Sequence, residues 1–325
     1  YHCMNPPYSS KVWADVVPRY MGNLIEASGR AGARLVALDN VYMLGKPNGK
    51  PLTDDTPMNP CSRKGEIRAR AAQMLFYEIA RRTGDERASR LVIRAANSGF
   101  ADDGSLREFM PLNGGWSDSL FMDIPILAKA GALTGERKYF DMAARHFFYM
   151  QKIVGRPDGL YRHQTSTDAA WGRGNGFPAL GLALTLTDLP KNHRDYPALL
   201  AAFQKHMKAL SEFQDENGMF REVVASAGSY PEYSGTSMIA TAMMRGIRRG
   251  WLDASIYQPI VDRAWRAILI RTASDGRLFD VAESTGTRGP TFKDFLRRAA
   301  ILDRDPRGGA LARLIATEIA GIGVE

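Results

Sequence analysis

Apolar residues recur at three- and four-residue spacing over most of the chain from about residue 72 onward, and this spacing is typical of amphipathic helices. Short turns rich in Gly, Asp and Asn separate the predicted helices. These helices span Gln73–Arg82, Leu120–Leu133, Phe140–Ile153, Ala179–Thr187, Ala198–Gln214, Ser237–Arg249 and Ile256–Thr272. We therefore expect an all-α domain over residues 72–325.

A turn with Asp or Asn before Gly recurs among these helices at Asp158-Gly159, Asn217-Gly218 and Asp275-Gly276, at intervals of about 59 residues. Such a period, with helices between the turns, indicates repeated helical hairpins. Hairpins that cannot bury their faces alone must stack or close into a ring. Two turns are followed by polar, glycine-bearing helix starts, at Gly174-Asn175 and Gly235-Thr236. On one end of a ring, these starts would form a single shared site.

The first fifth of the chain has a different pattern. Val12–Ser28 has helical spacing, Ala31–Tyr42 suits a buried parallel strand, and Ser62–Arg82 is helical after a turn-rich loop. This order is typical of part of a doubly wound α/β sheet and not of an independent domain.

The seven residues Trp171–Phe177 read Trp-Gly-Arg-Gly-Asn-Gly-Phe and have the composition of a binding site. Glycines allow close backbone approach, Arg offers a planar fork for a carboxylate, and Trp offers a flat wall for a sugar ring. A glycine-rich surface turn is the alternative interpretation. The spacing is not G-x-G-x-x-G and no β-branched strand precedes it, so a phosphate loop is not indicated.

Charge and cysteine content narrow the possible functions. The 325 residues carry a net charge of +8, with a pI near 9.5, which favours an acidic partner. Acidic polysaccharide is favoured over nucleic acid, because Lys and Arg are scattered rather than clustered with aromatic residues. Cys3 and Cys61 form no C-x-x-C pair, so we expect no metal centre and a reducing compartment. No apolar run reaches the ~18 residues of a membrane span.

Four stretches in the first fifth of the chain carry a family resemblance. They are His2–Tyr8, Leu38–Tyr42, Pro51–Pro57 and Ser62–Gly65. Residues 1–71 resemble the middle of an extended short-chain dehydrogenase, an NAD-dependent epimerase-like protein. The glycine-rich cofactor loop of that family is not in the chain. The family's Tyr-x-x-x-Lys pair fails at Lys64, because Pro60 stands four residues before it; Tyr42 and Lys46 have the spacing, but on a strand end that runs into a loop. We interpret this segment as a structural remnant or a fusion scar and expect no cofactor.

Six blocks in order carry a second resemblance, and they are Trp116–Met122, Leu133–Phe140, Trp171–Phe177, Ser229–Ser237, Gly246–Leu252 and Arg304–Gly309. Residues 72–325 resemble the unsaturated glucuronyl and rhamnogalacturonyl hydrolases, glycoside hydrolase families 88 and 105. The resemblance implies an (α/α)6 barrel, here incomplete because the dehydrogenase-like segment replaces its first helices. It also implies hydrolytic removal of a 4,5-unsaturated uronic acid from pectin-derived oligosaccharides, without metal or nucleotide.

The resemblance also implies roles for particular residues. Asp118 matches one of two active-site aspartates, although an Asp before a helix is also a typical N-cap. The second, the proton donor, is assigned to Asp168, which lies later than in the family's His-x-Trp-Asp setting. The resemblance places the substrate-binding residues at Trp116, His163, Trp171, Arg173 and Asn175. His163 is equally well interpreted as a loop histidine without a ligand role. We expect Glu222 and Glu232 to be solvated.

Two alternatives remain beside the hydrolase: an NAD-dependent epimerase and a degenerate, non-catalytic toroid that binds acidic sugar. The family suggests a cytoplasmic protein. The sequence opens at Tyr1 without Met, so the numbered start need not be the natural one, and secretion stays open. Oligomeric state, uronic acid, linkage and aglycone are not predicted.

Overall fold

A computed structural model describes residues 77, 80–81, 83–110, 115–283, 289 and 291–321. The chain divides into two compact units, Tyr1–Asn97 and Ser98–Glu325. In the first, α3 (Glu86–Asn97) begins after Asp85, whose Oδ1 accepts the backbone N–H of Arg87 at 2.8 Å. The predicted dehydrogenase-like segment and its boundary after residue 71 lie outside the described residues.

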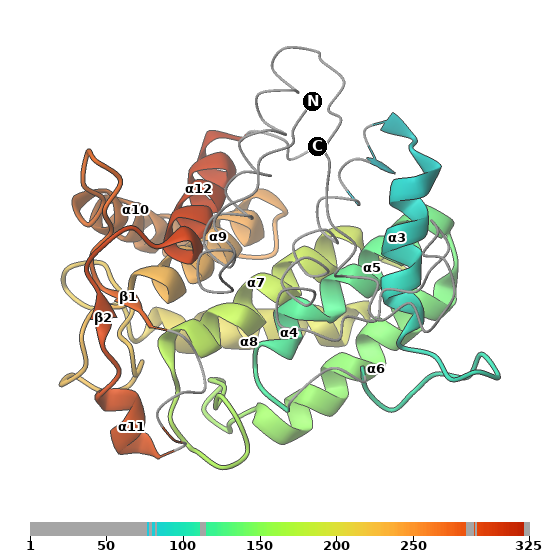
Figure 1. Ribbon diagram of the computed structural model, residues 1–325, viewed down its shortest axis with the longest axis horizontal. Coiled ribbons are helices and arrows are strands. Elements are labelled where there is room, and N and C mark those ends of the chain that lie inside the picture. Colours follow the sequence, from blue (N-terminus) through green and yellow to red (C-terminus); the bar gives the residue numbers. More distant parts are fainter. Residues whose placement is uncertain are drawn as a thin grey trace, which may run out of the picture. The chain divides into compact units, whose positions relative to one another are not determined.

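The second unit consists mainly of helices paired along the chain. They are α4 (Ser119–Met122), α5 (Ile124–Thr134), α6 (Arg137–Val154), α7 (Gly172–Asp188), α8 (Tyr196–Ser211), α9 (Tyr233–Arg248) and α10 (Ala254–Ile270). Helices α5, α7 and α9 bury most of their residues, whereas α6, α8 and α10 each keep an exposed face. Because α7 packs against both α5 and α9, the buried helices form an inner layer (Figure 1).

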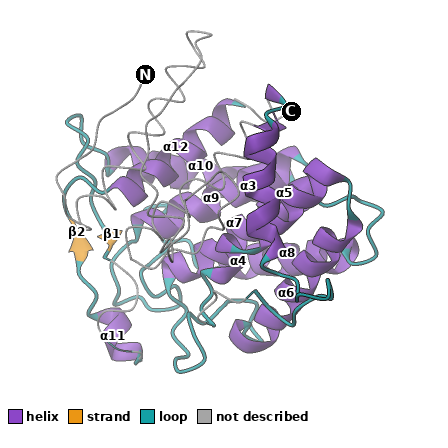
Figure 2. Ribbon diagram, turned by 45° about the vertical axis from the view of Figure 1, so that its right-hand side comes forward, coloured by secondary structure: helices purple, strands orange, loops and turns teal. Residues whose placement is uncertain are grey.

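The last part of the unit was not predicted from the sequence. Two short strands, β1 (Val281–Ala282) and β2 (Ala300–Ile301), pair antiparallel. Between them lies α11 (Phe292–Leu296), and after them α12 (Pro306–Ala320) packs against α9. Figure 2 shows α9, α10 and α12 together, with β1 and β2 at the left edge and α11 below them, and β1 packs against α9. No helix among the described residues is long and apolar enough to cross a membrane.

The predicted turns are confirmed, and two predicted helices differ from the observed ones by more than a shift of a few residues at an end. Gly159, Gly218 and Gly276 all have positive φ, as a glycine turn requires. The helix expected over Leu120–Leu133 is broken at Asp123, and the second piece, α5, begins with Pro125 in its first turn. Proline is tolerated there because the N–H groups of a first turn have no partner inside the helix.

Helix α7 begins seven residues earlier than predicted, so residues 172–177 are helical and not a glycine loop. These glycines serve close packing and have no positive φ. A Cβ on Gly172 would lie 2.3 Å from the carbonyl oxygen of Arg221, and one on Gly235 would lie 2.6 Å from the carbonyl carbon of Gly172. The glycine spacing therefore allows the starts of α7 and α9 to touch through their backbones.

Candidate active site

The starts of α4, α7 and α9 are brought together by loops that cross between them. Trp171 is the N-cap residue of α7. The N–H of Gly172 donates to the carbonyl of Glu222 at 2.7 Å, and the N–H of Val224 donates to Ala170 at 2.8 Å. The α8–α9 loop thus runs along the start of α7 and places the side chain of Glu222 in the interior.

Trp171 is fully buried and surrounded by cations and rings. The guanidinium carbons of Arg173 and Arg298 lie 4.7 and 4.9 Å from its ring centre, and the His163 ring lies at 5.0 Å. The Trp171 ring has no exposed face on which the predicted sugar could stack. The exposed aromatic of the site is Trp116, which is 36% exposed and lies 5.3 Å from the His163 ring.

Asp118 and His163 form a close pair at the edge of this aromatic group. His163 Nδ1 lies 3.3 Å from Asp118 Oδ2, with the imidazole buried and the Asp118 side chain 18% exposed. The backbone N–H of Ser117 donates to the His163 carbonyl at 2.8 Å, which ties the two loops together. Asp118 stands at the N-cap position of α4, yet its side chain makes no capping bond. The capping alternative for Asp118 is therefore wrong.

Asp168, the predicted proton donor, lies in a different environment. Its side chain is 81% exposed and pairs with Arg162 Nη1 at 3.0 Å, while its backbone carbonyl accepts from Arg156. A general acid that works near neutral pH needs burial or a like charge nearby to hold its proton. The structure gives Asp168 an exposed position beside a cation instead, so its role stays a prediction.

Two predicted ligand contacts, Arg173 and Asn175, are engaged within the protein. Arg173 Nη1 donates to Ala282 O at 3.0 Å and to Ser234 Oγ at 3.2 Å, and its Nη2 donates to Glu283 O at 2.5 Å. The buried carboxamide of Asn175 accepts from the N–H of Tyr161 and donates to the carbonyls of Tyr161 and Trp171. Both side chains hold backbone segments in place, and we assign Asn175 no contact with sugar hydroxyls.

The expectation that Glu222 and Glu232 are solvated is wrong, because both are fully buried. Glu232 is the N-cap residue of α9, and its carboxylate accepts from the N–H groups of Ser234, Gly235 and Ala282 at 2.9, 2.5 and 3.0 Å. A Glu three residues before a glycine-bearing helix start was the available signal. It was missed because Glu is not among the preferred N-cap residues.

Glu222 has no such partners: both carboxyl oxygens are buried without a hydrogen bond to any described residue. Burial, reinforced by the charge of Glu232, raises the pKa of Glu222 well above its ordinary value. The cations Arg173 and Arg298 and the indole of Trp171 oppose this rise only in part. Its surroundings therefore favour the protonated form of the Glu222 carboxyl group.

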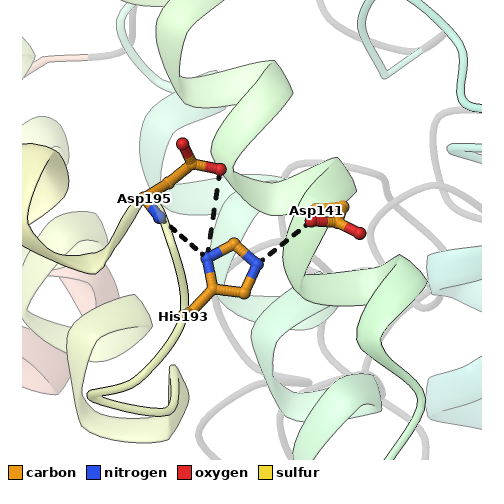
Figure 3. A group of neighbouring side chains, drawn as sticks. All are labelled: Asp141, His193 and Asp195. Carbon is orange, nitrogen blue, oxygen red and sulfur yellow. Dashed lines mark hydrogen bonds and ion pairs between the residues drawn. The ribbon is translucent and has the colours of Figure 1, made fainter.

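Asp141, His193 and Asp195 form a second cluster of possible metal ligands, with ligand atoms within 4.8 Å of one another (Figure 3). The lone pair of His193 Nδ1 accepts the N–H of Asp195 at 3.2 Å, and Nε2 faces Asp141 Oδ1 at 3.2 Å. Arg194 contacts both carboxylates, at 3.4 and 3.3 Å. The possible ligand atoms thus contact one another or Arg194. The cluster links the start of α8 to α6.

Comparison with known proteins identifies relatives among the glycoside hydrolases. The model of Glycosyl Hydrolase Family 88 matches residues 62–322, beginning inside the segment expected to be dehydrogenase-like. An unsaturated 3S-rhamnoglycuronyl hydrolase of Formosa agariphila is 29% identical over 183 residues, which are 50% of this chain and 48% of that protein. The unsaturated rhamnogalacturonyl hydrolase YesR of Bacillus subtilis is 27% identical over 52% of this chain and 50% of its own length. The chain thus spans about half the length of the curated relatives it matches.

Solved structures confirm the expected (α/α)6 fold. A family 105 glycoside hydrolase from C. acetobutylicum superposes with a TM-score of 0.65 at 24% identity, over 77% of this chain and 78% of that chain. A family 88 glycosyl hydrolase from Bacteroides vulgatus gives a TM-score of 0.66 at 20% identity, over 78% and 74%.

Proposed function

Because the chain belongs to glycosyl hydrolase family 88, we propose that it removes a 4,5-unsaturated uronic acid from the non-reducing end of pectin-derived, rhamnogalacturonan-type oligosaccharides. The matched relatives carry names for hydrolases of unsaturated rhamnogalacturonyl and rhamnoglycuronyl sugars. The net charge of +8 fits an acidic substrate.

The proposed reaction is a hydration and not a direct displacement at the anomeric carbon. A carboxylic acid gives its proton to C4 of the enol ether, and the developing cation at C5 takes a water oxygen, whose spare proton returns to a base. The product is a hemiketal at C5. It opens to a ketone, and the hemiacetal left at C1 then expels the sugar alcohol. One water is consumed and the acid is regenerated, so one carboxyl group can serve as acid and then base.

The Asp118–His163 pair is the observation that carries this proposal. Its carboxylate is partly open to solvent, beside the exposed ring of Trp116. The neighbouring His163 has both ring nitrogens buried without a hydrogen-bond partner among the described residues. The imidazole lies 3.3 Å from this carboxyl group and so restricts its orientation. We assign Asp118 as the acid or base, and keep Asp168 as a second donor to be tested.

The test follows the ultraviolet absorbance of an unsaturated rhamnogalacturonan disaccharide, because hydration removes the conjugated enol-ether band. We expect Asp118→Asn to lower kcat/KM by roughly 100- to 10,000-fold, and Asp168→Asn to lower it much less. A large loss in Asp168→Asn alone would return the donor role to Asp168. Unchanged turnover in both variants would show that neither carboxyl group takes part in the reaction.

Absence of turnover with unsaturated rhamnogalacturonan and glucuronan disaccharides, from folded protein, would favour the non-catalytic sugar-binding toroid. An NAD titration by calorimetry addresses the epimerase alternative separately, and heat of binding at micromolar NAD would revive it.

A further inference from the structure

Arg298 is a buried guanidinium with a hydrogen-bonding group that nothing satisfies. It follows α11, its residue is 4% exposed, and its Nη1 has no hydrogen-bond partner among the described residues. Burying a charge without a partner is costly, and native proteins rarely do so without a functional reason. The group therefore needs an explanation beyond stability.

Two aromatic rings lie against this guanidinium. Its carbon lies 4.0 Å from the ring centre of Phe295 and 4.9 Å from that of Trp171. Contact with the two rings does not use the edge N–H groups of the guanidinium, which are the groups that bind carboxylates. The same two rings lie 5.9 and 5.0 Å from His163. Arg298 and the Asp118–His163 pair therefore share one aromatic wall.

The charged groups around Arg298 leave its hydrogen-bonding capacity unfilled. The negative charges of Glu222 and Glu283 favour its charged form, but Nη1 bonds to no described residue. Arg173 carries the same charge and is bonded to backbone carbonyls. Glu222 faces Arg298, but its own hydrogen-bonding capacity is unfilled and its pKa is raised. Burial together with Arg173 lowers the pKa of Arg298, a direction that an arriving anion would reverse.

We propose that the guanidinium of Arg298 binds the carboxylate of the uronyl residue, next to the Asp118–His163 pair that acts on the same sugar ring. This inference deepens the proposed function and rests on it for the identity of the sugar. Arg173, which the sequence suggested for this role, instead holds β1 and the start of α7 together through Ala282 and Glu283.

The experiment compares an unsaturated uronyl–rhamnose disaccharide with its methyl ester, which lacks the negative charge. The ratio of kcat/KM for acid over ester is measured in the parent, in Arg298→Met and in Arg297→Met. Arg297 is the exposed neighbour and provides a matched control. Comparing ratios between variants cancels the intrinsic reactivity of the two compounds.

A charge-assisted hydrogen bond corresponds to roughly a 10- to 100-fold preference. We expect Arg298→Met to lose that much of the acid-over-ester ratio, and Arg297→Met to keep it. An unchanged ratio in Arg298→Met would overturn the proposal. If that variant does not fold, Arg298→Lys is used, because Lys keeps the charge but not the planar fork. It should keep only part of the preference, and full retention would count against the fork as the recognition element.

A second measurement separates this proposal from the proposed reaction. A saturated galacturonyl–rhamnose disaccharide has no double bond to hydrate, and its binding is followed by calorimetry. If the disaccharide binds in an Arg298-dependent way but no unsaturated substrate is turned over, the anion subsite is supported and the proposed hydrolase reaction is contradicted. If unsaturated substrate is turned over but parent and Arg298→Met bind the saturated disaccharide equally, the reaction is supported and the anion subsite is contradicted.

Discussion

Two buried ionic clusters of this protein differ in whether their charges are satisfied. Between α9 and α12, Glu318 is held by Arg245 Nη2 at 2.6 Å and by Arg248 Nη1 at 3.3 Å. Around Trp171, by contrast, Glu222 and Arg298 have buried polar atoms without partners. We call these the α9–α12 cluster and the Trp171 cluster.

We interpret the α9–α12 cluster as part of the fold and the Trp171 cluster as part of a ligand site. A buried carboxylate with two guanidinium partners has its desolvation offset within the protein, although such pairs add little net stability over apolar packing. Unsatisfied buried groups lower the stability of the free protein, and a ligand can relieve that cost. Changes in the α9–α12 cluster should therefore alter stability, and changes in the Trp171 cluster should alter binding and pH dependence.

Replacing Glu318 should have the largest effect on stability. Glu318→Gln leaves Arg245 and Arg248 without a counter-charge in a largely buried position, and breaking such an arrangement costs about 2–4 kcal/mol. Urea denaturation followed by circular dichroism measures this loss. Activity per folded molecule should stay at the parental level.

The exposed Glu216→Gln is the control for the loss of one negative charge, and it should leave the unfolding midpoint in place. A Glu318→Gln variant as stable as this control would mean that the α9–α12 cluster contributes nothing, and the contrast between the clusters would fail.

Replacing Glu222 should change the pH dependence of stability. A raised pKa means that the folded state binds more protons than the unfolded state between the ordinary Glu value and the raised value. The contribution of Glu222 to the free energy of unfolding is therefore fully present below the ordinary pKa of Glu. It falls as the pH rises from that value toward the raised pKa, by at most about 1.4 kcal/mol per pH unit. Glu222→Gln removes that decline, so its stability relative to the parent should increase from pH 5 to pH 8.

Urea unfolding of both proteins at the two pH values gives the relative stability directly. A constant or decreasing difference would show that Glu222 is ionised in the folded protein, paired with Arg298, and the Trp171 cluster would then resemble the α9–α12 cluster.

The smallest expected effect comes from two adjacent glycines at the start of α12. A Cβ on Gly309 meets nothing within 4 Å, so Gly309→Ala should stabilise the helix by about 0.5–1 kcal/mol. A Cβ on Gly308 would lie 2.8 Å from Leu278 Cδ1, so Gly308→Ala should not stabilise. Thermal melting compares the two. Equal shifts would show that packing at this helix start does not distinguish these positions.

Helical periodicity and turn chemistry were sufficient to predict most of the helices and all three glycine turns. The predicted Ile256–Thr272 and the observed α10 differ by two residues at each end. Such agreement is possible because the buried face of an amphipathic helix requires apolar residues at three- and four-residue spacing, which the sequence shows directly. Among the elements that were missed, β1, β2 and α11 are two to five residues long, which is too short to show a period. The 15-residue helix α12 was also missed, and its length does not account for that.

The sequence by itself determined the helical hairpins, the glycine turns and the family, whereas the tertiary structure decided the environment of each charged group. Trp171 and Glu222 are buried because the α8–α9 loop lies on the start of α7, and Asp168 remains exposed beside Arg162. Arg173 contacts Ala282, which is 109 positions away. Loop residues have no period that reports burial, and their electrostatics depend on partners distant in the sequence. Only the folded chain shows which carboxyl and guanidinium groups are buried without a hydrogen-bond partner among the described residues.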